Sequence, residues 1–386
     1  WVAPTAELGL HLLLRAVALA GQSVGLSDPN PRVGCVLHGA DGLLAGEGFT
    51  QQAGGPHAEV MALRDAAAAG RSVAGGTAWV SLEPCAHHGR TPPCADALVA
   101  AGLARVVVAL QDPFDKVAGR GVARLRAAGI QVELAGPGPA RQAAQALNIG
   151  FLSRVLRAQP WVRMKLAASL DGRSALPDGR SQWITGDAAR RDGHAWRRRA
   201  GAVLTGIGTV RSDDPRLDVR WLPTQHQPMR VVLDSHFATP PTARLLAPPG
   251  RVLVVGTQDA PERMAALRAA GADVMQLPGA DGRVDLPALL ARLAADGVGE
   301  LHVEAGAVLS GALLAAGLVD ELLVYLAPML IGPGRAMADL PLLPALADAL
   351  PMQFSSVDPV GTDLRLLLRR QGAAAFLDDA RTAGGG

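Results

Sequence analysis

Three residues in the first hundred are of the types that bind a transition metal: His57 in "GPHAEVMAL", and Cys85 and Cys94 in "LEPCAHHGRTPPC". Zinc is bound in proteins by imidazole nitrogens and thiolates, and a catalytic zinc has three protein ligands with water in its fourth position. Glu59, two residues after His57, could take a proton from that water and deliver it to a departing amine. The residue types and their spacing therefore predict a zinc site that performs hydrolytic deamination.

The spacing between the two cysteines differs from that of the common base deaminases. Those enzymes carry H-x-E followed by P-C-x-x-C, whereas eight residues separate Cys85 from Cys94, and we interpret the difference as an insertion in the loop. His57 and Cys94 each follow a proline and begin a predicted helix, and a helix N-terminus favours a thiolate. Two other interpretations stay open: a structural zinc with His87 or His88 as fourth ligand, and ordinary buried residues without a metal.

These residues stand at the ends of alternating strand-like and helical segments. Cys85 is predicted to end a strand, and Cys35 to be a core residue of another strand. The alternation predicts an α/β unit with a layered sheet. Strand-like runs lie at 32–39, 76–82 and 104–110, and helical runs lie at 8–20, 57–70, 94–103 and 121–129.

A Gly/Pro-rich turn, a polar helical segment and a proline between residues 133 and 160 indicate a domain boundary. We therefore predict a first domain over residues 1–147, a second over 148–371 and a flexible tail over 372–386. The second domain is again predicted to be α/β. Its strand-like runs lie at 161–170, 200–210, 229–235, 250–257, 273–277, 300–306 and 321–330, of which the last could be a core strand or part of a subunit interface.

Composition narrows the class of protein. Apolar residues make up 49% and charged residues 19% of 386 residues, which is typical of a globular chain with two domains. A net charge of +2 and 3% aromatic residues disfavour a nucleic-acid binder. Three cysteines are too few for a disulfide framework and predict a reducing, cytoplasmic setting. We find no transmembrane segment or secretory signal and expect a small-molecule enzyme without a membrane partner.

Four segments together resemble the deaminase half of the RibD family of bifunctional riboflavin-biosynthesis deaminase/reductases: "NPRVGCVL", "GPHAEVMAL", "LEPCAHHGRTPPC" and "QDPFDKVAGRG". The resemblance implies a cytidine-deaminase-like three-layer domain. It implies hydrolytic deamination of 2,5-diamino-6-(5-phosphoribosylamino)pyrimidin-4(3H)-one, a phosphorylated pyrimidine. It also implies substrate contacts by Asn30, His87 and Arg90. From the residues alone, Asn30 could equally be a turn residue, and His87 and Arg90 part of a solvated loop.

The second half lacks a Rossmann dinucleotide motif, because Arg211 stands where "GIGTVRS" would need its third glycine. "ELHVEAGAVLSGALLAAG" is typical of a strand, a glycine turn and a helix whose N-terminus could face an anion, although a plain strand–helix connection is the alternative. With "KLAASLDGR", "SQWITG", "TGIGTVRSDDPRLDVR" and "VVLDS", this segment resembles the reductase half of the same family. The resemblance implies a dihydrofolate-reductase-like domain, NADPH as cofactor and a homodimer formed through this domain.

Position by position, the resemblance implies two sets of contacts in the second domain. The NADPH contacts would come from Ala167, Trp183, Thr209, Asp213, Ser235 and the turn formed by Gly306, Ala307, Val308, Leu309, Ser310, Gly311 and Ala312. The substrate contacts would come from Ser181, Arg197, Leu217, Arg220 and Glu304. The arginines offer guanidinium forks for a phosphate, and the glutamate can accept from ribose hydroxyls. Without the motif context, surface salt bridges would be the simpler interpretation of the arginines.

Two further residues stand out. Lys165 is one of only two lysines, and we predict a catalytic role for it near the substrate; a strand-end charge that reaches solvent is the alternative. Asp218 stands where the resemblance implies a threonine-like residue. An acidic side chain beside Arg220 is expected to compete with the substrate phosphate for the guanidinium.

The sequence thus predicts a zinc-dependent deaminase followed by an NADPH-dependent reductase. Three alternatives remain. The first is a nucleic-acid or nucleoside base deaminase with a C-terminal binding module, and the second is a zinc-stapled scaffold without catalysis. The third is a protein in which one of the two domains has lost its activity.

Overall fold

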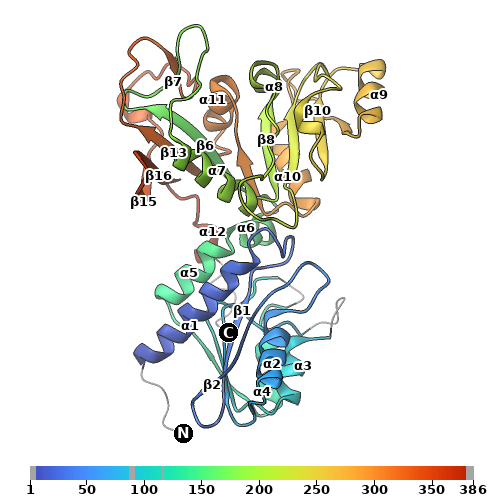
Figure 1. Ribbon diagram of the computed structural model, residues 1–386, viewed down its shortest axis with the longest axis vertical. Coiled ribbons are helices and arrows are strands. Elements are labelled where there is room, and N and C mark those ends of the chain that lie inside the picture. The colour runs from blue at the N-terminus through green and yellow to red at the C-terminus, as the bar shows by residue number, and fades with distance from the viewer. Residues whose placement is uncertain (1–5, 87–91, 115–116, 380–386) are drawn as a thin grey trace. The chain divides into compact units, whose positions relative to one another are not determined.

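The computed structural model describes residues 6–86, 92–114 and 117–379 (Figure 1). The chain divides into two compact units, one built mainly from the residues up to Arg157 and the other spanning Ala158–Asp378. The boundary predicted after residue 147 lies between the last two helices of the first unit. No helix in these described ranges combines the length and apolar character needed to cross a membrane.

The first unit is a five-stranded sheet between two layers of helices. Its elements are α1 (Ala6–Ala20), β1 (Gly34–His38), β2 (Leu44–Phe49), α2 (Ala58–Ala68), β3 (Thr77–Val80), α3 (Cys94–Ala100), β4 (Arg105–Val108), α4 (Arg120–Ala127), β5 (Gln131–Leu134), α5 (Pro139–Leu147) and α6 (Ile149–Arg157). The strand order is β2-β1-β3-β4-β5, with β1 antiparallel to both neighbours and the other pairs parallel. Figure 1 shows α1 and α5 on one face and α2, α3 and α4 on the other, which confirms the predicted layered sheet.

Two glycines let the helices approach this sheet closely. A Cβ atom on Gly34 of β1 would lie 2.0 Å from the carbonyl oxygen of Ala16 in α1. A Cβ atom on Gly48 of β2 would lie 2.5 Å from the carbonyl oxygen of Ala58, the first residue of α2. Any larger residue at Gly48 would push the start of α2, and with it the neighbouring His57, away from the sheet.

The second unit is built on a nine-stranded sheet. Its elements are β6 (Trp161–Ser169), β7 (Arg173–Ala175), α7 (Asp187–Arg199), β8 (Ala202–Gly206), α8 (Ile207–Asp213), β9 (Met229–Leu233), β10 (Val252–Gly256), α9 (Pro261–Ala269), β11 (Asp273–Gln276), α10 (Leu286–Ala295), β12 (Glu300–Val303), α11 (Ala307–Ala315), β13 (Glu321–Ala327), β14 (Arg335–Ala336), β15 (Met352–Val360), β16 (Asp363–Arg370) and α12 (Phe376–Asp379). The sheet order is β11-β10-β9-β8-β12-β6-β13-β16-β15. The strands from β11 to β13 are parallel, and β16 and β15 are added antiparallel.

Every strand predicted from an apolar run is present, including β13. The run at 321–330 is a core strand over most of its length, because β13 pairs with β6 and β16 and buries Leu323 and Tyr325. The segment predicted to be a flexible tail begins with packed residues. Ala373 is buried, and the ring of Phe376 lies 6.3 Å from that of Trp161.

Candidate active sites

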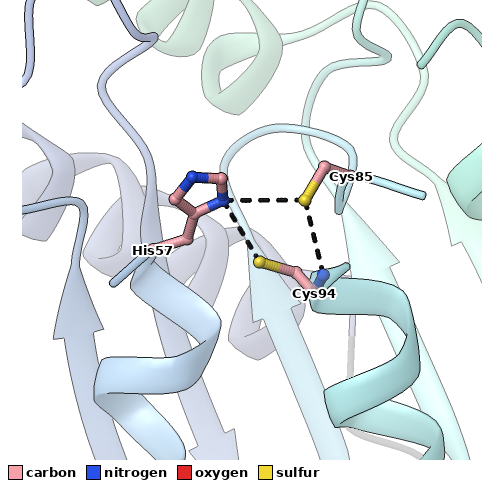
Figure 2. A group of neighbouring side chains, drawn as sticks. All are labelled: His57, Cys85 and Cys94. Carbon is pink, nitrogen blue, oxygen red and sulfur yellow. Dashed lines mark hydrogen bonds between the residues drawn. The ribbon is translucent and has the colours of Figure 1, made fainter. Parts of the chain in front are cut away.

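His57, Cys85 and Cys94 converge on one point of the first unit (Figure 2). The Nδ1 atom of His57 lies 3.6 Å from the Sγ atom of Cys85 and 3.3 Å from that of Cys94. All three potential ligand atoms lie within 4.8 Å of one another. A side chain from each of three separate segments therefore points into the same small volume.

The start of each of two helices and one loop position these side chains. His57 is the N-cap residue of α2, and Cys94 is the first residue of α3. The prediction that Cys85 ends a strand is wrong, because β3 ends at Val80 and Cys85 lies in the loop that follows. The backbone N–H of Cys94 donates to the Cys85 sulfur at 3.4 Å. This hydrogen bond holds the loop against the N-terminus of α3.

The three side chains fit a tetrahedral zinc ion. Bond lengths of about 2.3 Å to sulfur and 2.0 to 2.1 Å to nitrogen place a nitrogen and a sulfur ligand of such an ion about 3.5 Å apart, so a shift of a few tenths of an ångström brings both observed pairs to this spacing. The observed separations between nitrogen and sulfur are 3.3 and 3.6 Å. Among the described residues no fourth histidine, cysteine or carboxylate joins the group. His87 and His88, the alternative fourth ligands, lie outside the described residues.

Glu59 lies in the first turn of α2 with its side chain buried. Burial raises the pKa of its carboxyl to about 7, and the neighbouring Cys85 adds to this rise. Hydrogen bonds from Cys94 and His57 lower the pKa of the Cys85 thiol despite its burial. The hydrogen bond with Cys85 in turn raises the pKa of His57. The cluster therefore combines a thiolate, its donors and a buried proton carrier.

Glu83, which the sequence analysis did not single out, fastens the loop that carries Cys85. Its buried carboxylate accepts backbone hydrogen bonds from Gly119 and Val122 at 3.1 Å each and from Asp112 at 3.3 Å. These bonds tie the residue two positions before Cys85 to the backbone of Asp112, Gly119 and Val122. The adjacency of "E" to "PC" was visible in the sequence, but the three backbone partners were not.

The remaining residues predicted for the first site divide into two groups. Asn30 lies in the turn before β1, where its backbone N–H donates to Ser27 at 2.9 Å. The predicted substrate contacts His87 and Arg90 lie outside the described residues.

In the second unit, Arg197 and Glu304 form an ion pair with two hydrogen bonds. The Nε and Nη2 atoms of Arg197, near the end of α7, donate to the two carboxylate oxygens of Glu304 at 2.5 and 2.8 Å. Its Nη1 atom donates to the backbone carbonyl of Asp218 at 3.0 Å. The charge of Arg197 outweighs burial and holds the pKa of Glu304 well below its usual range. The Arg197 fork is therefore already used to orient Glu304.

Lys165 belongs to the same region. It lies on β6, its side chain is partly buried, and its ammonium lies 6.0 Å from the centre of the Tyr325 ring. Burial lowers the pKa of Lys165, Glu304 opposes that shift, and Arg197 adds to it. This arrangement differs from a strand-end charge that reaches freely into solvent.

The other predicted substrate contacts flank this region. Leu217 and Arg220 lie in the loop after α8; the Leu217 side chain is buried, and that of Arg220 is partly exposed and paired with Asp218 at 2.8 Å. Ser181 lies in the loop before α7.

Two histidines that the sequence analysis did not identify also contact this cluster. His302 is fully buried on β12, and its Nε2 atom lies 3.3 Å from Glu304. The Nδ1 atom of His194, on α7, accepts the backbone N–H of Arg220 at 3.4 Å. Spacing carried a signal for both, since His302 precedes Glu304 by two residues in the strand-like run 300–306 and His194 precedes Arg197 by three on a helix.

The turn before α11 offers a position for an anion. Gly306 is the N-cap residue of this nine-residue helix and has no side chain that could cap it, and Val308 in the first turn of α11 is exposed. A helix N-terminus with free N–H groups favours an anion. A Cβ atom on Gly306 would lie 3.8 Å from the Thr209 hydroxyl, which brings α8 next to this turn. Asp213 ends the same helix α8.

The other predicted nucleotide contacts lie on different elements. Ala167 lies on β6, and Ser235 follows β9. Trp183 is exposed, stacks beneath the Arg190 guanidinium at 4.2 Å, and borders a cavity of about 340 Å³. Within α11 itself, a Cβ atom on Gly311 would lie 1.9 Å from the backbone oxygen of Asp339, so only glycine fits there.

Two protein families match this chain by sequence. Residues 9–110 match the family described as the cytidine and deoxycytidylate deaminase zinc-binding region, and residues 160–366 match the RibD C-terminal domain. The two matches fall on the first and second unit, respectively, and agree with the predicted cytidine-deaminase-like and dihydrofolate-reductase-like domains.

Relatives match over almost the whole length. The chain is 45% identical over 372 residues to the riboflavin biosynthesis protein RibD of Escherichia coli (strain K12), covering 93% of this chain and 98% of that protein. The Haemophilus influenzae protein of the same name is 40% identical, with 93% and 96% covered.

Solved structures agree. The RibD of Acinetobacter baumannii in its form 1 superposes with a TM-score of 0.84 at 41% identity, covering 95% of this chain and 99% of that one. A diaminohydroxyphosphoribosylaminopyrimidine deaminase/5-amino-6-(5-phosphoribosylamino)uracil reductase of Thermotoga maritima superposes with a TM-score of 0.83 at 29% identity, covering 94% and 99%.

Proposed function

This chain belongs to the RibD family, and from that membership and the geometry of its two sites we propose how it performs two consecutive steps of riboflavin biosynthesis. The first unit deaminates 2,5-diamino-6-(5-phosphoribosylamino)pyrimidin-4(3H)-one by hydrolysis. The second unit then reduces the ribosyl side chain of the product to a ribityl chain. The observation that carries the deaminase assignment is the convergence of His57, Cys85 and Cys94 beside the buried Glu59.

For the first step, His57, Cys85 and Cys94 are proposed to hold zinc. A bound zinc ion lowers the pKa of a water ligand to about 7 and so supplies a nucleophile at neutral pH. Glu59 is the general acid and base: its carboxylate accepts a proton from the water and later donates it to the departing amine. Its position in the first turn of α2, two residues after His57, supports this role. Asn30, His87 and Arg90 remain proposed substrate contacts.

For the second step, a bound NADPH would supply the hydride that reduces C1 of the sugar. Glu304, held by Arg197 at 2.5 and 2.8 Å, is proposed to orient the ribose hydroxyls. Lys165, whose charge interacts with Glu304, is proposed to stabilise the oxygen that leaves the sugar carbon. Leu217, Arg220 and Ser181 complete the proposed substrate contacts, with Arg220 at the phosphate.

NADPH is proposed to bind along the turn from Gly306 to Ala312. The uncapped N-terminus of α11 and the adjacent Thr209 support a diphosphate position. The exposed ring of Trp183 offers a face for stacking. Ala167, Asp213 and Ser235 are the other proposed contacts.

We also propose a homodimer that forms through the second unit. Strand β15 is an edge of the nine-stranded sheet, and exposed apolar side chains gather in the segment that ends in it. An uncovered edge with apolar side chains favours association. The exposed residues are Leu342, Leu346, Leu350, Phe354 and Val357.

The three cysteines form no disulfide with one another, which supports the proposed cytoplasmic setting.

One assay tests the central proposal. The purified protein receives the diaminopyrimidine substrate, and NADPH oxidation is followed by absorbance beside Glu59→Gln. The wild type should oxidise NADPH, whereas the variant should do so only when the deaminated uracil is supplied. Failure of the wild type to oxidise NADPH with the uracil would contradict the reductase assignment, and oxidation by the variant with the diamino substrate would contradict the role of Glu59.

A further inference from the structure

Arg216, Asp218 and Arg220 form a charged triad in the loop after α8. The Nε and Nη2 atoms of Arg216 donate to Oδ2 of Asp218 at 3.0 and 2.9 Å, and Nη1 of Arg220 donates to Oδ1 at 2.8 Å. The Asp218 side chain is only 4% exposed, while those of the arginines are 37% and 42% exposed. One buried carboxylate thus holds two guanidinium groups that both reach solvent.

The triad keeps a net positive charge and unused donors. Burial alone would raise the pKa of Asp218, but hydrogen bonds from both arginines lower it, so the carboxylate stays ionised between two cations. A guanidinium has five N–H donors. Asp218 uses two donors of Arg216 and one of Arg220. In the part of the chain that the structure describes, neither guanidinium donates any other hydrogen bond.

Hydrogen bonds hold the backbone of this loop in place at Asp218 and at the following residue, Val219. Arg197 donates to the carbonyl of Asp218 at 3.0 Å. The side-chain amide of Gln227 accepts the N–H of Val219 at 2.7 Å and donates to its carbonyl at 2.8 Å.

Leu217 adds to this evidence for a fixed loop. It has a φ of 53°, in the left-handed region that a leucine rarely adopts, and its side chain is buried. Such a conformation persists only where the surroundings impose it. The two arginines are therefore mounted on a rigid loop.

We propose that Arg216 and Arg220 together bind the phosphate of the reductase substrate, and that Asp218 is a positioning residue that holds the two forks in place. This inference rests on the proposed reductase function. Planar guanidinium groups match phosphate oxygens bidentately. Arg197, which orients Glu304, also bonds to the Asp218 backbone, so the triad adjoins the groups assigned to the ribose. That adjacency favours the substrate phosphate over a phosphate of NADPH.

The proposal reverses the effect expected of Asp218 from sequence. Beside Arg220 alone, an aspartate would compete with the phosphate. With Arg216 as a second cation, the carboxylate instead orders both forks before the substrate arrives and lowers the cost of binding. The two roles predict opposite effects of removing its charge.

The test measures kcat and KM of the reductase for the deaminated uracil phosphate, for its dephosphorylated form and for NADPH. Arg216→Gln should raise KM for the phosphorylated substrate about tenfold, since one charge-assisted contact is lost. It should leave KM for the dephosphorylated form and for NADPH unchanged. Asp218→Asn should also raise KM for the phosphorylated substrate with little change in kcat. Urea unfolding of each variant establishes that it folds.

Arg251→Gln is the matched control. Arg251 donates through Nε and Nη2 to one oxygen of Asp273, as Arg216 does to Asp218, but the pair joins the start of β10 to the edge strand β11. It changes net charge equally and should leave every KM unchanged.

Several results would overturn the inference. A lower KM for Asp218→Asn would show competition with the phosphate, and an unchanged KM for Arg216→Gln would remove that residue from the site. A rise confined to the KM for NADPH would assign the arginines to the cofactor. If the wild type shows no reductase activity, the proposed function fails. Calorimetric binding of ribose 5-phosphate to wild type and Arg216→Gln then decides the phosphate site, and equal affinities would overturn it.

Discussion

The Nδ1 atom of His57 lies 3.3 Å from the sulfur of Cys94, a residue 37 positions further along the chain. Two helices that start at the same end of the first unit bring these atoms together, and the loop fastened by Glu83 brings Cys85 to them. The ligand set therefore depends on how α2 and α3 pack on the sheet.

Removal of a ligand should abolish metal binding. Cys94→Ala should hold far less zinc than the wild type, which should contain about one ion per chain because three ligands form a single site. Deamination should be lost, while reduction of the deaminated uracil should continue. Elemental analysis and the two separate assays measure these effects. Cys35→Ala, which removes the third cysteine, should keep its zinc; equal zinc in Cys94→Ala would contradict the ligand assignment.

Glu59→Gln should separate catalysis from metal binding. The change removes the proton carrier but keeps the shape of the side chain, so deamination should fall by about 10²- to 10⁴-fold. Zinc content and the reductase rate with the uracil substrate should stay at wild-type values. Glu262→Gln alters the corresponding first-turn position of α9 in the other unit and serves as control. Loss of zinc from Glu59→Gln would indicate a structural role instead.

Lys165→Met should affect only the reductase. Methionine has a similar length but no charge, and the partly buried ammonium next to Glu304 would be missing. We expect kcat for reduction to fall by about 10²-fold or more, a loss of the size typical for one electrostatic group at a reacting oxygen. Deamination, measured as ammonia released, should be unchanged. A variant with wild-type kcat would leave Lys165 as a structural residue.

Gly48→Ala should disturb the metal site from a distance. The new Cβ atom would lie 2.4 Å from the Ala62 nitrogen and 2.5 Å from the Ala58 oxygen, both in α2. Overpacking of this kind costs about 1 to 3 kcal/mol of unfolding free energy. Urea unfolding and zinc affinity should both show the change, because α2 begins beside His57. Gly21→Ala, whose Cβ atom would meet nothing within 4 Å, should change neither.

His194 should make the second unit less stable as the pH falls. Burial, together with the charges of Arg197 and Arg220, lowers its pKa to about 4, although Glu304 and Asp218 oppose the shift. Below pH 6.5, the ordinary pKa of about 6.5 for histidine, His194 binds a proton in the unfolded chain but stays neutral in the folded protein. Its contribution is therefore complete above pH 6.5 and is lost as the pH falls towards 4.

Urea unfolding at pH 7 and pH 5 measures this loss. His194→Gln should lose less stability between the two pH values than the wild type, because glutamine can still accept the Arg220 N–H at both. His226→Gln, a change at an exposed histidine, should behave like the wild type. Equal losses in all three proteins would be inconsistent with a neutral His194 in the fold.

The two-domain organisation and most strands were predictable because they depend on local patterns. Buried strands such as β1 and β10 are continuous apolar runs, which need no knowledge of their neighbours. Strands with mixed or polar composition were missed: β2 contains two glycines packed against α2, and charged and polar residues occur in the edge strand β15 and in its neighbour β16. Their stability comes from pairing with a neighbour, which a single sequence does not display.

The sequence by itself determined which residue types could bind zinc, carry a proton or contact a phosphate, because motif spacing is local and survives in the linear chain. Only the tertiary structure decided which charges pair. The sequence places Glu304 at 107 residues from Arg197, yet the two form a fork, and Arg216 shares Asp218 with Arg220 through a loop whose turn at Leu217 no pattern predicted. Such pairings follow from distance and burial after folding, since both set the strength of an interaction between charges.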